Sequence, residues 1–260
     1  MIKGLYAAAS AMLAGLTRQN IISHNLANID TPGFKQVLTS LDEFVDTPVS
    51  THSRPAGWLT PIRSVAQPRA LGDLGLGVET IQPVTDFEAG ALRQTGQPLD
   101  LALHGAGFFQ VQTPEGARFT RDGRFLRDAD GTLVTVDGFQ VLDAAGAPIT
   151  LPEGTPSVAG DGTLTVNGQP VGQLGLVSFA DPAAELSRDP VNGNLFLAAG
   201  APTGAEAGTV VQGFLETANL NPAQLMTQMV AVGRAYEAAQ RLVQTQDELL
   251  GRAIATISRL

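Results

Sequence analysis

A long helix with a narrow apolar stripe is the feature that most constrains this chain of 260 residues. Asn221 and Pro222 supply an N-cap side chain and a proline for the first helical position, so we expect the helix to begin there. From residue 225 to the end, apolar residues recur in steps of four and three, interrupted only by Gln246. The stripe comprises Leu225, Met229, Val232, Tyr236, Ala239, Val243, Leu250, Ala253, Ile257 and Leu260. Such a helix would be about 58 Å long, which outruns a compact domain.

The N-terminus carries a weaker stripe with the same spacing. It comprises Ile2, Leu5, Ala9, Met12 and Leu16, and Leu26 restores it after Gln19 and Ser23. A repeat of 3.5 residues favours packing along another helix. A solitary core helix at the C-terminus is the alternative. The length of that helix and the matching stripes favour the two ends pairing as a coiled-coil-like base.

The middle of the chain has the pattern of a β domain. Asp-Gly pairs at 122, 130, 137 and 161 and Asn-Gly pairs at 167 and 192 separate short runs of β-branched and aromatic residues. These pairs are typical of tight hairpin turns. We therefore predict an α+β fold with a mainly antiparallel β central domain.

The pattern divides the chain into five segments. Residues 1–35 form an N-terminal assembly helix and turn, and 36–90 are a proline-rich extended connector. Residues 91–200 form the β domain, 201–218 a low-complexity linker, and 219–260 the C-terminal assembly helix.

Composition excludes several classes of partner. With 25 Asp and Glu against 16 Lys and Arg, the net charge of −9 disfavours nucleic acid. There is no cysteine for disulfides or thiolate metal sites, and no run approaches the roughly 20 apolar residues of a membrane span. The N-terminus mimics a signal peptide, but its apolar spacing continues to Leu26, so we expect no cleavage and no membrane insertion.

Motifs for chemistry are missing from the sequence. His24, His52 and His104 are isolated, no dinucleotide fingerprint is complete, and we predict no catalytic, cofactor or metal site. The turn at residues 128–131 has Phe139 where a calcium loop needs glutamate. The alternative is a secreted polysaccharide hydrolase that pairs carboxylates from Asp86, Glu88, Asp100 and Asp122 in a cleft, or a binding module.

Three stretches resemble one family. They are NLANIDTPGFK (25–35), the region TGQPLDLALHGAGFFQV with FTRDGRFLRDADGTLVTVDGFQVL (95–111 and 119–142), and TANLNPAQLMTQMVAVGRAYEAAQRLVQTQDELL (217–250). Over most of its length the chain resembles the bacterial flagellar basal-body rod and hook protein family. Its length matches the proximal and distal rod proteins, and TPGFK with the C-terminal ending slightly favours the proximal type.

The resemblance implies a non-enzymatic subunit that polymerises into the rod, the drive shaft crossing the periplasm between motor and hook. Its partners would be other copies, other rod and hook subunits, the flagellar type III export apparatus and the surrounding ring proteins. Export would occur without signal cleavage.

The resemblance also assigns residues. The family's signature turn corresponds to Asn25, Leu26, Ala27, Asn28, Thr31, Gly33 and Phe34. A family export-gate pattern, a phenylalanine followed after three residues by an apolar residue, matches Phe34 and Leu38. The alternative is that these two side chains simply pack the connector. The residues of the assembly seam would be the apolar stripes of the two terminal helices.

Overall fold

The computed structural model describes residues 2–39, 41–43, 46–51, 69–75, 78–80, 83–200 and 208–257. The chain forms two compact units. One comprises residues 1–23, 39–83 and 226–260, and the other comprises 24–38 and 84–225. The first contains most of both terminal helices, and the second contains the β domain together with the signature turn.

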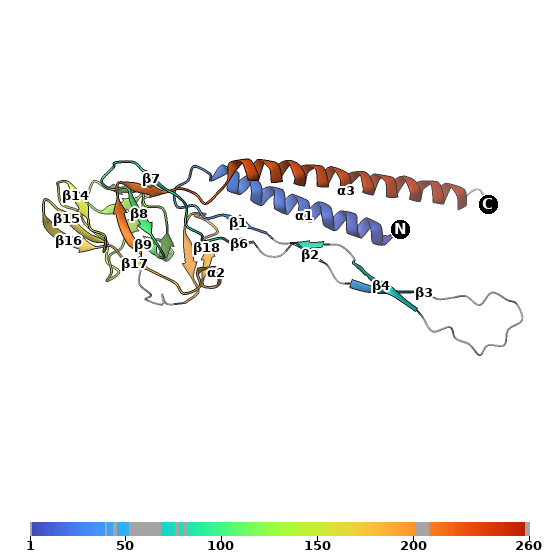
Figure 1. The fold of residues 1–260 in the computed structure, drawn as a ribbon, viewed down its shortest axis with the longest axis horizontal. Coiled ribbons are helices and arrows are strands. Elements are labelled where there is room, and N and C mark those ends of the chain that lie inside the picture. Colours follow the sequence, from blue (N-terminus) through green and yellow to red (C-terminus); the bar gives the residue numbers. More distant parts are fainter. Residues whose placement is uncertain are drawn as a thin grey trace, which may run out of the picture. The chain divides into compact units, whose positions relative to one another are not determined.

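The two terminal helices pair side by side, as predicted (Figure 1). They are α1 (Ile2–Ala27) and α3 (Pro222–Ile257). A Cβ built on Gly4 would lie 3.2 Å from Nε2 of Gln246, and one on Gly15 would lie 3.8 Å from Cδ2 of Tyr236. The earlier residue of α1 lies near the later residue of α3, and the later residue of α1 lies near the earlier one. The two helices are therefore antiparallel.

The start of α3 follows the predicted cap. The amide of Gln224 donates to Oδ1 of Asn221 at 3.2 Å, and Pro222 occupies the first helical position. Leu225, Val232 and Ala239 are buried. The next stripe members, Met229, Tyr236, Val243, Gln246 and Leu250, are half-buried.

The face of α1 that packs in the pair differs from the predicted stripe. Leu5 and Leu16 are 36% and 42% exposed, whereas Ala8, Ala14 and Ile22 are buried. Met12 and Leu26 are half-buried, and the side chains of Ile2 and Ile257 lie outside those described. Small residues at 4, 8 and 15 face the partner because they let the helices approach closely, which turns larger apolar residues outward.

The proline-rich segment contains paired strands. β1 (Val37–Leu38) pairs with β6 (Val84–Thr85), β2 (Leu41–Glu43) with β5 (Val78–Thr80), and β3 (Asp46–Thr51) with β4 (Arg69–Gly75), all antiparallel. The expected extended connector is therefore ordered into ladders where it is described. Residues 52–68 lie outside the described residues.

The β domain is built from short antiparallel strands, as predicted. The main sheet has the order β11-β12-β13-β9-β10-β19-β18, with β17 also paired to β9, and a second sheet has the order β14-β15-β16. Strand pairs β20-β8 and β21-β7 complete it. The strands are β7 (Leu92–Gln94), β8 (Leu101–His104), β9 (Phe108–Thr113), β10 (Gly116–Thr120), β11 (Phe125–Arg127), β12 (Leu133–Thr135), β13 (Gln140–Val141), β14 (Pro156–Val158), β15 (Thr163–Val166), β16 (Gln169–Gln173), β17 (Leu176–Val177), β18 (Leu186–Arg188), β19 (Phe196–Ala198), β20 (Thr209–Gln212) and β21 (Phe214–Glu216).

Two hydrophobic clusters form the core of this domain. One includes Leu101, Phe109, Phe125, Leu133 and Leu164, and every one of these side chains is almost fully buried. The other gathers four phenylalanines with Leu186; they are Phe108, Phe119, Phe179 and Phe196. We call this second group the phenylalanine cluster.

Three local features test the sequence reading of the domain. Asn167 and Gly168 both have positive φ and join β15 to β16 in a two-residue turn, as Asn-Gly predicts. A four-residue helix, α2 (Pro182–Glu185), lies within the domain that the sequence predicts to be mainly antiparallel β. Residues 209–216, expected to be linker, form β20 and β21 because apolar Val210 and Leu215 are buried in the domain.

Candidate functional site: a polar junction around the signature turn

The signature turn begins with capping bonds at the end of α1. The amide of Asn28 donates to the carbonyl of Asn25, and the amide of Thr31 donates to the carbonyl of Asn28, both at 3.1 Å. The Asn28 side chain donates to the carbonyl of His24 at 2.9 Å and accepts from the Thr31 hydroxyl at 3.2 Å. Leu26 and Ala27, the last two helical residues, are half-buried and exposed. The polar residues of the turn therefore satisfy the backbone groups that the helix leaves open.

Asn25 fixes the chain that leaves the turn. Its side chain is buried and bonds both backbone groups of Val37, donating from Nδ2 to the carbonyl at 2.8 Å and accepting the amide at Oδ1 at 3.0 Å. An amide side chain can offer one donor and one acceptor in this way, whereas a carboxylate or an alkyl group cannot. Asn25 therefore holds β1 against the end of α1.

Gly33 lies where the turn touches the β domain. Its φ is +68°, and an added Cβ would be 2.3 Å from the carbonyl carbon of Arg121. Its amide donates to the carbonyl of Glu216 at 2.8 Å. Both the left-handed backbone and the close approach require glycine here.

Lys35, Arg121 and Glu216 form a buried ionic cluster. Nζ of Lys35 lies 2.6 Å from Oε1 of Glu216, with both side chains 1% exposed, and it also donates to the carbonyl of Glu88. Nη1 of Arg121 lies 3.2 Å from Oε2 of the same glutamate. Burial lowers the pKa of Lys35 and of Arg121, and Glu216 opposes that shift for each. The cluster ties residue 35 to residue 216 through one carboxylate.

Phe34 is covered by the side chain of Arg188. The guanidinium carbon lies 4.7 Å from the centre of the Phe34 ring and 5.4 Å from that of Phe196. Nη2 of Arg188 also donates to the carbonyl of Lys35 at 2.7 Å. Burial lowers the pKa of Arg188 to about 10, and burial with the nearby Arg188 charge lowers the pKa of His24. Phe34 is itself buried, while Leu38 is exposed.

Asn219 joins the same region to the start of α3. Its Oδ1 accepts the amide of Gln36 at 2.7 Å, and its Nδ2 donates to the carbonyl of Asp86 at 3.1 Å. We use the name polar junction for residues 25–38 with Arg121, Arg188, Glu216 and Asn219. All of these residues lie in one compact unit.

Sequence reasoning found only part of the polar junction. The signature residues were identified, but Arg121, Arg188, Glu216 and Asn219 were missed, and Lys35 was given no role. Glu216 lies 181 residues from its partner Lys35. The available signal was local, because Glu216 is a lone charge in the apolar run VVQGFLE and such residues are rarely buried unless paired.

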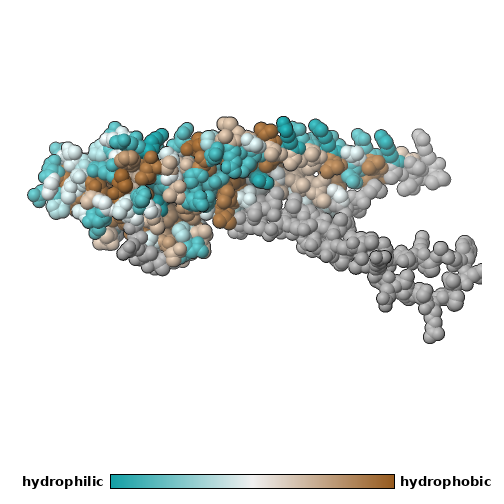
Figure 2. All heavy atoms as spheres, in the orientation of Figure 1, coloured by the Kyte–Doolittle hydropathy of each residue, from teal (hydrophilic) through white to brown (hydrophobic). Residues whose placement is uncertain are grey.

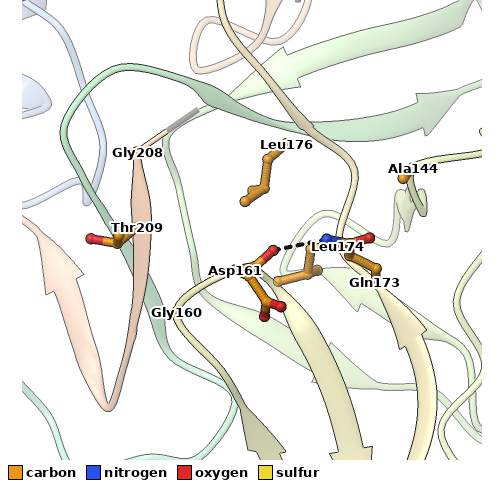
Figure 3. A pocket seen from close by; sticks show the side chains of 8 residues that line it. All are labelled: Ala144, Gly160, Asp161, Gln173, Leu174, Leu176, Gly208 and Thr209. Atoms are coloured by element: carbon orange, nitrogen blue, oxygen red, sulfur yellow. Dashed lines mark hydrogen bonds between the residues drawn. The ribbon is translucent and has the colours of Figure 1, made fainter. Parts of the chain in front are cut away.

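The cavities offer little for catalysis. One cavity has a volume of about 510 Å³. Its lining includes Leu174 and Leu176, with Asp161 as its one carboxylate (Figure 3). The Asp161 carboxylate accepts the amide of Thr163 at 2.9 Å, and its backbone carbonyl accepts from Nε2 of Gln173 at 3.0 Å. Within the described ranges, no group of three His, Cys, Asp or Glu could hold a metal ion, and neither terminal helix is long and apolar enough to span a membrane.

Two of the four carboxylates considered for hydrolysis have partners in the structure. Asp122 lies 2.7 Å from Nη2 of Arg124, and Asp86 accepts the amide of Glu88. Asp100 pairs through its backbone with Arg124. The carboxylates of Asp122 and Asp86 hold local turns, and the polar junction joins segments of the chain that are far apart in sequence.

Family models match three parts of the chain. The model of the flagella basal body rod protein covers residues 5–35, that of the flagellar hook protein FlgE/F/G D1 domain covers 102–173, and that of the flagellar basal body rod FlgEFG protein C-terminal covers 211–256. The first ends at Lys35, and the third includes Glu216. The matches therefore contain both partners of the buried ion pair.

Curated relatives match almost the whole chain. Flagellar basal-body rod protein FlgG of Bacillus subtilis is 30% identical, covering 96% of this chain and 97% of its own length. Flagellar basal-body rod protein FlgF of Rhizobium meliloti is 33% identical, covering 99% and 98%. FlgG of Agrobacterium fabrum is 32% identical, covering 95% and 97%.

This chain belongs to the flagellar basal-body rod protein family. Its members are structural proteins and not enzymes. Relatives called FlgG and relatives called FlgF match at the same level of identity.

Proposed function

We propose that this chain is a structural subunit of the bacterial flagellar rod, which assembles helically with other copies and with other rod and hook subunits. In this role the polymer lies in the basal body, spans the periplasm and transmits torque from the motor to the hook. The subunit passes through the type III export apparatus without signal cleavage and then contacts the surrounding ring proteins. Family membership supports the structural role.

The observation that carries helical assembly is the apolar surface left on the helix pair. Most of the large hydrophobic side chains that are exposed among the described residues lie on α1 and α3. They are Leu5, Tyr6, Leu13, Leu16, Met226, Val230, Leu242, Leu249 and Ile254. Figure 2 shows apolar surface exposed along the helices. We call these residues the helix-pair surface.

Large apolar patches that stay exposed on a protein surface mark interaction sites. The helix-pair surface is therefore a candidate contact surface for a neighbouring subunit. Burying an apolar side chain of this size stabilises an interface by about 1.5–3 kcal/mol. Contacts of one copy with a different face of the next extend into a helical filament when the rotation between copies does not close a ring. Each helix of the antiparallel pair thus packs one face against the other helix, and the helix-pair surface stays available to neighbouring subunits.

Charge substitutions on the helix-pair surface test this function. Leu242→Glu and Ile254→Glu should leave the monomer folded, since both side chains are more than half exposed, and should block incorporation into basal bodies. Gln244→Glu, on the same exposed helix, is the matched control and should assemble. Normal motility and incorporation of the Leu242→Glu, Ile254→Glu double variant would refute the proposal.

The export pattern can be tested separately from folding. Phe34 is buried in the polar junction, so Phe34→Ala would change stability as well as any export signal. Leu38 is 46% exposed, and Leu38→Ala should leave folding unchanged. We propose that Leu38→Ala lowers secretion in a flagellated host. Unchanged secretion of both Leu38→Ala and the Phe34→Ala, Leu38→Ala double variant would contradict an export role for this pattern.

A further inference from the structure

A second cavity lies beside the polar junction, on the β-domain side. Its volume is about 230 Å³, and its lining includes Phe87, Phe108 and Phe179 with Ala89, Ala106 and Arg121. Phe108 and Phe179 belong to the phenylalanine cluster, and Phe87 packs against that cluster. The cavity is therefore an apolar, aromatic space with one cationic side chain in its wall.

Two buried cations share one carboxylate beside this cavity. Lys35 and Arg121 both bond the carboxylate of Glu216. Lys35 also has the charge of Asp86 nearby, whereas Glu216 is the electrostatic partner of Arg121. Arg121 is the member of the cluster that lines the cavity.

The guanidinium of Arg121 keeps donor capacity. Its Nη1 donates to Glu216 and its Nη2 to the carbonyl of Gly105, but its buried Nε has no hydrogen-bond partner among the described residues. A buried, unsatisfied donor on a charged group is costly, so an acceptor at this site would be stabilising. The planar guanidinium suits a carboxylate in particular.

We propose that this cavity binds a carboxylate group carried on a short apolar stem. The carboxylate would accept from the buried Nε of Arg121, and the stem would contact the phenylalanine rings. Two sources present this chemistry: a small free carboxylic acid, and an acidic side chain of a second copy. The second source is abundant, because each chain carries 25 Asp and Glu.

Titration of the full chain with benzoate tests the proposal directly. Benzoate fits an aromatic cavity and supplies the carboxylate, and benzamide is its neutral counterpart. We expect saturable NMR shifts of the Arg121 Nε–H and of the amides of Gly105 and Gly107, with benzamide about tenfold weaker or worse. Absence of saturable benzoate shifts, or equal binding of benzamide, would overturn the proposal.

Two variants locate the binding. Ala106→Phe fills the cavity from an exposed position without altering Arg121, and should weaken benzoate binding about tenfold or more. Ala129→Phe adds the same side chain to an exposed turn that does not line the cavity, and should bind as the native chain does. Equal affinity of the two variants would place benzoate elsewhere and refute the site.

Dilution of the benzoate-free protein distinguishes the two sources. A shift of the Arg121 Nε–H that depends on protein concentration, and that benzoate displaces, identifies an acidic side chain of a second copy. A shift that is independent of concentration, together with benzoate binding, identifies a small carboxylic acid. Either result supports the carboxylate site, and the proposal does not depend on rod assembly.

Discussion

The polar junction and the helix pair differ in the side chains that they use and in how far those side chains are buried. The polar junction uses buried charges, a buried asparagine and a left-handed glycine to hold segments almost two hundred residues apart. The helix pair uses small residues on its packed side and leaves large apolar side chains exposed. The polar junction forms its ion pairs within a single chain, whereas large apolar side chains of the helix pair stay exposed.

This difference separates folding from assembly. Directional bonds to buried groups specify one arrangement, because a lost partner leaves a desolvated charge or amide behind. The hydrophobic interaction has no preferred direction, so exposed apolar residues can be covered by any neighbour of suitable shape. We therefore expect substitutions of the buried residues of the polar junction to change the free energy of unfolding, and those on the helix-pair surface to change polymerisation.

The largest effect on stability should come from Glu216→Gln. The change keeps the shape of the side chain but removes the one carboxylate that bonds both buried Lys35 and buried Arg121, which costs about 3–5 kcal/mol of unfolding free energy. Glu237→Gln is the matched control, because Glu237 and Arg241 form an exposed pair at 3.9 Å, and its effect should be near zero. Urea denaturation measures both. A loss below about 1 kcal/mol for Glu216→Gln would contradict a stabilising role for the polar junction.

Gly33→Ala should be next in size. Its Cβ would overlap the backbone of Arg121 in addition to the strain of a positive φ, so we expect a loss of about 3 kcal/mol. Gly96 has a similar φ of +74° with nothing near its Cβ position, and Gly96→Ala should cost only about 1 kcal/mol. Thermal unfolding of the two variants separates close approach from backbone strain. Equal losses would show that the contact at Gly33 is unimportant.

Asn25→Ala should have a smaller effect. It leaves both backbone groups of Val37 without their buried partner, at a cost of about 2 kcal/mol. Asn28→Ala removes bonds to His24 and Thr31 at a more exposed position and should cost about 1 kcal/mol or less. Hydrogen exchange of the Val37 amide should accelerate only in Asn25→Ala. An unchanged exchange rate would mean that this amide is protected in another way.

The smallest effect concerns pH. Burial raises the pKa of Asp189, but bonds from Arg118 and from the amides of Asn192 and Val191 outweigh it and bring the pKa below its usual value. A lowered folded-state pKa stabilises the fold above the unfolded value of about 4 and loses that contribution as the pH falls. Asp189→Asn should therefore be less stable than the native chain at pH 7, with the difference shrinking below about pH 4. A constant difference across that range would contradict this assignment.

The sequence predicted the parts of the fold that depend on neighbouring residues. The cap at Asn221, the α3 stripe through Leu225 and Val232, and the Asn167-Gly168 turn follow from local spacing and backbone preference. The α1 face was not predicted, because Leu5 has the right spacing but the close approach of α3 selects Gly4 and Gly15 instead. Periodicity identifies a stripe and does not show which neighbour covers it.

The polar junction was harder to predict for a different reason. Gly33 was recognisable as a turn residue, but its contact with Arg121 depends on the path of the whole domain. The pairing of Lys35 with Glu216 is likewise set by tertiary structure, because it closes a loop of 181 residues. Charge and residue type alone do not identify the partner over such a separation.

Cryo-electron microscopy of purified basal bodies containing this subunit is the most direct test of the central claim. We predict that the polar junction keeps its bonds within each subunit, while Leu13, Leu242 and Ile254 on the helix-pair surface are buried against neighbouring subunits. A rod in which these three side chains face solvent, or in which Glu216 pairs with a neighbouring subunit, would contradict the separation of folding from assembly.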